Sequence, residues 1–510
     1  MLKKIHILFL SSLLISLFAP FSYAEDEVVL TEDVPEESLD TIDAFIDADS
    51  VVMVDRNIIF DASKTYNPTP DQELTYEWHL GDGNRQQGVE IVHSYTEPGE
   101  YQVTLVVRNN DEEQDVETHT IFVYERTFLL ITDNSEESTK LQSLSDYAKE
   151  QGVYVNLVGS FGESSEFLSE EALSQKLQEA VSTIDNYDTI VLWTVGSSGL
   201  TILSQLSQFS EDTQGIFTDS EIIVISDQSL GTLENIAQGT FRTVDPKRIV
   251  LTRPEALWPL VDASTIDVFL ADLDLRGVTY EIVDSSVGIG ITNFMSYLVN
   301  YMVEKGVPSN SLKLILMLPV IVTMVAFFKQ VVGLETLGVY TPSILTLSFI
   351  ALGIEFGLFM LFIILLFGTL SRIILGKYRL LYIPRMAIVL TIVSVTILVT
   401  LLMGAYLGVT QLVSISIFPM LIMSTLVEKF ISIQTEKGLK SALFIIVECV
   451  IVSVLCYIVA EWVFLKTLMF GHPELIFLFI AINVFLGRWT GLRVMEYMRF
   501  REIFMHSEEE

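Results

Sequence analysis

Residues 442–464 read ALFIIVECVIVSVLCYIVAEWVF, and Glu448 is the only charged side chain between Ala442 and Ala460. A membrane-spanning helix needs about 17 to 25 predominantly apolar residues to cross ~30 Å of hydrocarbon. The run has that length and that composition. It therefore predicts a protein that crosses a membrane as α-helix.

Six further apolar runs lie in the C-terminal part of the chain. They cover 312–328, 339–354, 356–375, 383–407, 412–426 and 474–486. Together the runs predict an α-helical bundle of seven transmembrane helices over 311–490, followed by a tail over 491–510. Spans 339–354, 412–426 and 474–486 are short, so both full crossings and broken or re-entrant paths stay open for them.

The distribution of Lys and Arg predicts the orientation of these spans, because basic residues accumulate in cytoplasmic loops. If the residues before the first span lie outside, the cytoplasmic segments hold twelve Lys and Arg, and the outer loops between spans hold only Lys466. We therefore expect a multi-pass protein of the cell (inner) membrane, with extracytoplasmic N-terminal domains and a cytoplasmic C-terminus.

The N-terminus predicts export. Lys3 and Lys4 precede an apolar stretch over 5–18, and Ala24 ends a small-residue cleavage site. Cleavage would remove a signal peptide over 1–24 and leave an acidic linker over 25–41. An uncleaved anchor helix is the alternative.

The charge balance divides the chain near Pro308. Residues 25–310 hold 53 acidic and 14 basic side chains, whereas residues 311–510 hold 12 and 14. The acidic part would repel nucleic acid and an anionic membrane surface, so neither is expected as its ligand. The two cysteines, Cys449 and Cys456, lie in one predicted span, so the exported part cannot be a disulfide scaffold.

Residues 42–125 show short alternating runs separated by turn signals, as in an antiparallel β-sandwich. Its distinctive segments are Phe60-Asp61-Ala62-Ser63, Tyr76-Glu77-Trp78-His79-Leu80-Gly81-Asp82-Gly83, His93-Ser94-Tyr95 and Pro98-Gly99-Glu100-Tyr101-Gln102-Val103-Thr104-Leu105. These segments resemble the polycystic-kidney-disease (PKD) repeat, whose domains are usually spacers or adhesion modules. We expect Trp78 to fill the core and Asp82 to hydrogen-bond its own turn; a Ca²⁺ site at Asp82 is the alternative.

Residues 126–284 alternate between strand and helix patterns, which predicts an α/β domain with an open, mostly parallel sheet. The expected strands are 127–132, 153–158, 189–194, 221–226, 248–251 and 278–283, with helices at 138–151 and 170–182. Residues 285–310 follow as a juxtamembrane segment. Its apolar spacing predicts an amphipathic helix over 289–303, either on the outer membrane interface or packed under the α/β domain.

Parallel sheets bind ligands at the carboxyl ends of their strands, so residues there are candidates for ligand binding. They are Asp133, Ser197, Ser198 and Asp227. The run Gly196-Ser197-Ser198-Gly199 could hold an anion on its backbone N–H groups, but a tight strand-to-helix turn without ligand is the simpler interpretation. We predict no catalytic residues, no metal site and no cofactor.

Several segments of the membrane part carry a second resemblance. They are Phe327-Phe328-Lys329-Gln330-Val331-Val332-Gly333, Gly338-Val339-Tyr340-Thr341-Pro342, Arg379-Leu380-Leu381-Tyr382-Ile383-Pro384-Arg385, Phe418-Pro419 and Gly487-Arg488-Trp489-Thr490-Gly491. They resemble the bacterial seven-helix domain that is often fused to an inactive transglutaminase-like domain. The resemblance implies a membrane scaffold that performs no chemistry, with a cytoplasmic ATP-grasp-like ligase and an aspartic-protease-like protein as partners.

The polar residues of the spans give further candidates. Glu448 is either a hydrogen-bonded packing residue or a coupling site for ions or protons. The glycine-rich break supplies Gly333, Glu335, Gly338 and Pro342 as functional candidates. Arg379 and Arg385 set the topology or dock an acidic partner.

The sequence therefore favours a non-enzymatic protein of the cell envelope, with exported binding or spacer domains and a seven-helix scaffold or signalling domain. A transporter or channel is the first alternative, because Glu448 lies within a span. An exported enzyme that acts through Asp133, Ser197 and Asp227 is the second.

Overall fold

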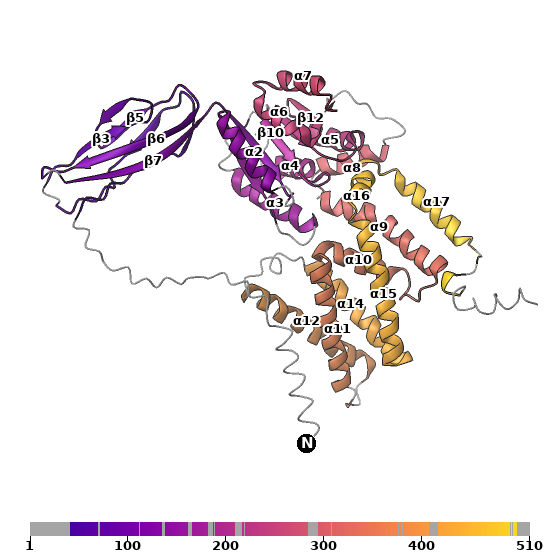
Figure 1. Cartoon of the computed structure of the whole chain (residues 1–510). Coiled ribbons are helices and arrows are strands. Elements are labelled where there is room, and N and C mark those ends of the chain that lie inside the picture. Colours follow the sequence, from indigo (N-terminus) through magenta and orange to yellow (C-terminus); the bar gives the residue numbers. More distant parts are fainter. Residues whose placement is uncertain are drawn as a thin grey trace, which may run out of the picture. The chain divides into compact units, whose positions relative to one another are not determined.

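The computed structural model describes residues 41–496 except for 70–71, 112, 135–137, 162–165, 182–186, 188, 210–216, 219, 284–293, 306, 308, 376, 379–380, 407–416, 490 and 492. The predicted signal peptide, the linker up to residue 40, Arg379 and the tail after residue 496 lie outside the described residues. The chain divides into two compact units, residues 1–123 and 124–510 (Figure 1).

The first unit is an antiparallel β-sandwich. One sheet has the strand order β1-β7-β6-β3-β4 and the other pairs β2 with β5. The strands are β1 (Val51–Met53), β2 (Ile58–Asp61), β3 (Thr75–His79), β4 (Arg85–Gln87), β5 (Glu90–His93), β6 (Gly99–Arg108) and β7 (Gln114–Tyr124). The core forms around Phe60 and Trp78, both fully buried, as expected for Trp78. Because the Trp78 ring also donates a 2.9 Å hydrogen bond to the Gly88 carbonyl, its polar edge is satisfied inside this core.

The turn after β3 is closed by the aspartate that the sequence indicated. Asp82 Oδ1 accepts a 3.0 Å hydrogen bond from the Asn84 backbone N–H, and Asp82 Oδ2 lies 2.7 Å from His93 Nε2. Burial disfavours the Asp82 carboxylate, but the hydrogen bonds from Asn84 and His93 outweigh this and hold its pKa below the ordinary value. Asp82 therefore fastens its own turn to β5.

The second unit begins with a doubly wound α/β domain. Its sheet has the strand order β13-β12-β11-β10-β8-β9. The strands are β8 (Arg126–Thr132), β9 (Val153–Gly159), β10 (Thr189–Trp193), β11 (Glu221–Ile225), β12 (Arg248–Thr252) and β13 (Glu281–Val283). All neighbours pair parallel except β12 and β13, which pair antiparallel at the edge. The prediction of a mostly parallel sheet is confirmed.

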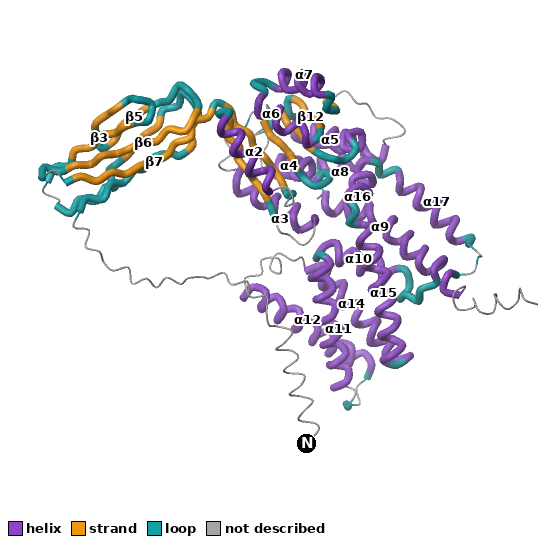
Figure 2. Tube along the Cα trace, viewed as in Figure 1, coloured by secondary structure: helices purple, strands orange, loops and turns teal. Residues whose placement is uncertain are grey.

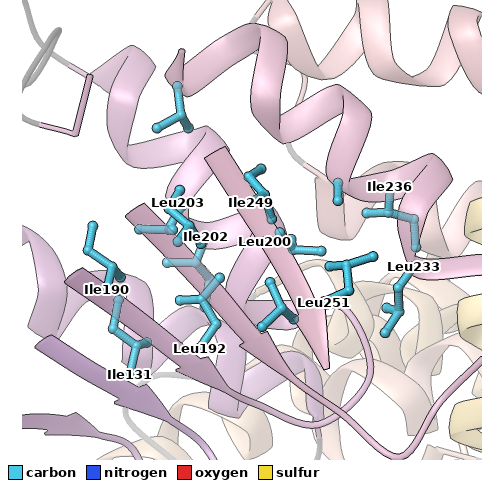
Figure 3. Packing of buried hydrophobic residues seen from close by; sticks show 14 of the residues in the cluster. Ile131, Ile190, Leu192, Leu200, Ile202, Leu203, Leu233, Ile236, Ile249 and Leu251 are labelled. Carbon is cyan, nitrogen blue, oxygen red and sulfur yellow. The ribbon is translucent and has the colours of Figure 1, made fainter. Parts of the chain in front are cut away.

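Helices cover both faces of this sheet (Figure 2). They are α2 (Ser138–Glu150), α3 (Glu166–Val181), α4 (Ser198–Phe209), α5 (Leu230–Val244), the 3₁₀ turn η2 (Pro254–Ala256), α6 (Leu257–Asp262) and α7 (Ile266–Arg276). Alternate strand residues enter different cores: Ile190 and Leu192 pack beneath α4 and α5 (Figure 3), whereas Val191 and Trp193 pack on the other face. Burial on both faces explains why these strands read as continuous apolar runs.

The chain continues into α8 and a helical region. The helices are α8 (Phe294–Glu304), α9 (Ser309–Phe327) with a π-helical turn η4 (Phe328–Val332), α10 (Tyr340–Leu352), α11 (Ile354–Leu375), α12 (Tyr382–Tyr406), α14 (Ile417–Lys437), α15 (Leu439–Ala460), α16 (Val463–Gly471) and α17 (Leu475–Gly487). Four of the described helices are long and apolar enough to cross a membrane, or five if the α16–α17 pair, bent by 110°, forms one broken span. A further short apolar helix, α10, is mostly buried within the bundle.

Three sequence expectations need correction. The helix predicted over 412–426 is described as α14 from Ile417 and continues to Lys437, because the charged residues from Glu428 onward end the apolar run but not the helix. The span predicted over 442–464 ends at Ala460, and the separate helix α16 follows, because Glu461 leaves the helical run and pairs with Lys466 at 2.6 Å. The strand predicted over 278–283 is shorter and begins at Glu281. Of the two places expected for the amphipathic helix, the structure shows α8 packed against α5 of the α/β domain.

The α/β domain and the helical region share one hydrophobic core. Leu312 and Leu316 of α9 and Phe470 of α16 belong to the same buried cluster as Leu233 and Ile236 of α5. These parts of the second unit are therefore packed together directly rather than joined through a flexible linker.

Candidate functional site

The strand order of the α/β sheet reverses between β8 and β10, because β9 follows β8 outward and β11 follows β10 in the other direction. In doubly wound sheets this switch point is where ligands bind, at the carboxyl ends of the strands. Asp133 follows β8, and the turn over 194–199 follows β10. Asp133 Oδ1 accepts a 2.7 Å hydrogen bond from the Val195 backbone N–H. The structure thus brings Asp133 to the turn that contains Ser197 and Ser198.

The geometry of this turn fits a structural role. Ser197 and Ser198 are buried, and the Gly199 N–H donates a 2.8 Å hydrogen bond to Thr194 Oγ1. A Cβ at Gly199 would lie 2.9 Å from the same oxygen, so the turn is tightly packed. Asp227 is exposed after β11 and is not part of this turn. Within the described ranges, no group of three or more His, Cys, Asp and Glu is placed to hold a metal ion.

A buried carboxylate lies nearby, and it was not among the sequence candidates. Glu170 of α3 is only 1% exposed. It accepts hydrogen bonds from Thr201 Oγ1 at 2.6 Å and from Lys313 Nζ at 2.8 Å. Lys313 belongs to the first turns of α9, so this ion pair joins the α/β domain to the first apolar span. A lysine inside an apolar run needs a partner, so Lys313 was the one residue in the sequence that indicated a buried carboxylate nearby.

The second candidate region lies in the helical bundle. The segment between η4 and α10 contains Gly333 at φ +93° and Gly338 at φ +78°, both in the left-handed region that favours glycine. The Glu335 backbone N–H donates a 2.8 Å hydrogen bond to Glu448 Oε2 in α15, and Glu448 is only 8% exposed. The carbonyl of Pro342, in α10, accepts a 3.1 Å hydrogen bond from the hydroxyl of Ser453 in α15. The structure therefore joins the break and Glu448, which the sequence offered as separate candidates.

A lysine lies at the beginning of α10. Lys429 Nζ of α14 is 2.8 Å from Thr341 Oγ1 and lies 5.2 Å from the centre of the Tyr340 ring. Three neighbouring elements, α10, α14 and α15, thus place polar groups around the break.

Two of the segments that carry the second resemblance meet. Gln330 Nε2 reaches the Trp489 carbonyl at 3.5 Å, and a Cβ at Gly333 would lie 3.0 Å from Cβ of Arg493. Arg385 is half-buried in α12, near the Arg372 guanidinium that donates to the Gln434 carbonyl at 3.1 Å. Docking of an acidic partner by Arg379 and Arg385 stays a prediction.

Comparison with known families decides what the C-terminal part is. Residues 291–504 match the family described as seven transmembrane helices usually fused to an inactive transglutaminase. Residues 291–504 are a seven-transmembrane domain of this family. Residues 42–123 match the PKD domain family. The chain with its seven-transmembrane domain is therefore a multi-pass membrane protein that carries a PKD domain.

Matches to individual proteins cover smaller parts. Collagenase ColA of Clostridium perfringens is 27% identical over 158 residues, which is 31% of this chain and 14% of the relative's length. The solved PKD1 domain of Vibrio anguillarum Epp is 23% identical, covering 17% of this chain and 95% of that domain, with a TM-score of 0.15. The PKD1 domain of the Vibrio cholerae metalloprotease PrtV is 24% identical, covering 16% and 96%, with a TM-score of 0.14.

Proposed function

We propose that this protein is a non-enzymatic scaffold of the cell envelope, with the PKD and α/β domains outside the cytoplasm and the seven-transmembrane domain docking a cytoplasmic partner. The orientation is supported by the twelve Lys and Arg of the expected cytoplasmic segments and by the predicted N-terminal export signal. The observation that carries the scaffold role is the junction between the α/β domain and the membrane helices.

This junction is suited to hold the two parts in one arrangement. It combines the shared core around Leu312 and Phe470 with the ion pair of Lys313 and Glu170. Breaking a buried ion pair by removing one partner costs about 3–5 kcal/mol, because an uncompensated charge stays buried. A ligand that displaced α3 would therefore also act on α9, and the reverse holds as well.

The candidate residues of the α/β domain argue against catalysis there. Asp133 is occupied by a backbone N–H, Ser197 and Ser198 are buried in a packed turn, and Asp227 is exposed beyond that turn. The exported enzyme is the weakest of the three functions.

Transport is the second candidate, and the contact between Glu335 and Glu448 favours it. Transporters place substrate or ion sites where helices are interrupted inside the membrane, and the break before α10 lies against a buried carboxylate. Reconstituted vesicles would decide this. A substrate or ion flux that is present in the wild type and lost in Glu448→Gln would replace the scaffold proposal with transport.

The scaffold proposal itself is tested through its partner. In-cell crosslinking, followed by purification through a tag after Glu510, should recover a cytoplasmic protein with an acidic docking face, and we propose an ATP-grasp-like ligase together with an aspartic-protease-like protein. The Arg379→Glu/Arg385→Glu variant should lose the ligase, whereas Lys140→Glu/Lys149→Glu in the exported α2 should retain it. Equal recovery with both double variants would contradict docking at Arg379 and Arg385.

A further inference from the structure

Helix α8 has two different faces. Its inner face carries Ser296, Val299 and Val303, which are all buried. Val299 and Val303 belong to the core of the α/β domain, and Ser296 Oγ donates a 3.0 Å hydrogen bond to the Gly471 carbonyl. Its outer face carries Phe294, Tyr297, Leu298 and Tyr301, which are 56, 37, 39 and 47% exposed. These four side chains, here called the α8 stripe, follow the i, i+3, i+4, i+7 spacing of one helix face. Because the inner face of α8 is already covered by protein, the apolar outer face needs a separate apolar or interfacial environment.

Two basic side chains border the α8 stripe. The Arg242 guanidinium lies 5.3 Å from the centre of the Tyr297 ring, and Lys305 Nζ lies 5.4 Å from the centre of the Tyr301 ring. This arrangement differs from that at Leu275, another exposed apolar position of the α/β domain. On α7, the highly exposed Leu275 lies between Asp274 and Arg276, and Arg276 is paired with Asp272, so the basic charge there is already matched by a carboxylate.

The position of α8 in the chain places the stripe near the membrane boundary. Residues 305–308 alone separate α8 from α9, the first apolar span. At the other end, Glu474 Oε1 accepts hydrogen bonds from the backbone N–H groups of Met295 at 3.0 Å and Ser296 at 3.2 Å. Glu474 directly precedes α17, the last apolar helix among the residues that the structure describes. Helix α8 is thus fixed at both ends to elements that enter the membrane.

We propose that the α8 stripe is seated in the headgroup zone of the bilayer leaflet on the side of the α/β domain, with Arg242 and Lys305 binding the phosphates of anionic lipids. Tyrosine suits this zone because its ring is apolar and its hydroxyl is polar. Basic residues beside an interfacial helix gain from the negative surface potential of anionic lipids. The span that follows, α9, also exposes an apolar side chain near its beginning, Ile315.

This assignment is compatible with the acidity of residues 25–310. That acidity led us to expect no anionic membrane as a ligand of this part of the chain, but within α8 the only charged residue is Glu304, and here we depart from that expectation. Attraction by Arg242 and Lys305 is therefore local. The proposal concerns lipid contact alone and holds whether the protein acts as scaffold or transporter.

Site-directed spin labelling of the full chain in phosphatidylglycerol vesicles tests the position of the stripe. Labels are placed by Leu298→Cys or Tyr301→Cys in a background with Cys449→Ala and Cys456→Ala; Leu275→Cys on α7 is the control. We expect the labels at 298 and 301 to collide more with oxygen than with a water-soluble nickel chelate, and the label at 275 to show the opposite preference. Labels at 298 and 301 that behave like the one at 275 would overturn the proposal.

A second measurement tests the lipid phosphates and does not depend on altering the stripe. The wild-type chain and the Arg242→Glu/Lys305→Glu variant are compared by hydrogen exchange of residues 294–305 in phosphatidylglycerol and phosphatidylcholine vesicles. The variant should lose the additional protection that phosphatidylglycerol gives, whereas Lys140→Glu/Lys149→Glu on α2 should retain it. Equal protection of both double variants in phosphatidylglycerol would overturn the role of Arg242 and Lys305.

Discussion

The backbone N–H of Glu335 donates a 2.8 Å hydrogen bond to the carboxylate of Glu448, 113 residues later in the chain. Irregular backbone at membrane depth is tolerated only where protein or a water-filled cavity satisfies its polar groups. Glu448 supplies such a partner to the break between η4 and α10. This contact gives the mid-span carboxylate a structural task, whatever else it does.

Removing the acceptor at position 448 should destabilise the bundle. In Glu448→Leu, the Glu335 N–H loses its partner, and a buried unsatisfied donor costs about 1–3 kcal/mol. Glu448→Gln keeps a carbonyl oxygen in the same place and should cost less than half as much. The free energy of unfolding in mixed micelles measures both. Equal losses in the two variants would show that the hydrogen bond does not stabilise the break.

Substitutions at the junction of α3 and α9 should lower the free energy of unfolding more than those at Glu448. Lys313→Met leaves Glu170 buried without its cation, which should lower the free energy of unfolding of the second unit by about 3–5 kcal/mol. Lys313→Met/Glu170→Met removes both charges and should recover most of this loss.

The matched control for this pair is an exposed one. Arg276 and Asp272 pair at 2.7 Å on α7 with half-exposed side chains, and such surface pairs contribute about 0–1 kcal/mol. A double-mutant cycle should therefore give a large coupling energy for Lys313 and Glu170 and a small one for Arg276 and Asp272. Similar coupling energies would contradict the importance of the junction.

Two glycines of the break should differ in their tolerance of alanine. Gly338→Ala meets open space and suffers only from its positive φ, which costs roughly 1 kcal/mol. Gly333→Ala has the same backbone penalty and also brings a Cβ to 3.0 Å from Arg493, so it should be the more destabilising change. Gly487→Ala, without positive φ or close neighbours, is the control. Thermal unfolding of the three variants would reveal the order, and the prediction fails if Gly338→Ala is the worst.

The PKD domain should lose stability in acid. The pKa of Asp82 is lowered in the folded state, so its carboxylate stabilises the fold above about pH 4 and this contribution disappears as the pH falls through the lowered pKa. Asp82→Asn should reduce the slope of stability against pH in this range. Urea unfolding of residues 42–124 between pH 2 and about 6 measures the slope. Asp49→Asn is the charge-matched control and should leave more of the slope in place.

The sequence predicted secondary structure well wherever buried residues recur at regular spacing or form a continuous apolar run along the chain. The strands of the α/β sheet are buried on two faces, and their runs, such as 189–194, could be read directly. The apolar runs likewise indicated the membrane helices. Local turn chemistry was also readable at Asp82, because its hydrogen bond is to Asn84, two residues away.

Contacts between distant polar residues could not be read in this way. Glu170 and Lys313 are 143 positions apart, and each has an ordinary interpretation by itself as a helix residue and a span-end lysine. Helix α16 was missed because its nine residues continue an apolar run without a glycine or proline before it. The break and Glu448 were both identified, but their contact depends on how α10 packs against α15.

The shared core has a consequence for the order in which the protein is made. Leu233 and Ile236 of the α/β domain pack in one cluster with Phe470, and Thr232 lies against Gly471. The ribosome synthesises α5 more than two hundred residues before this last part of the cluster. The α/β domain therefore completes this core only after α16 has been synthesised, so its maturation depends on the assembly of the helices that lie between α5 and α16 in the chain.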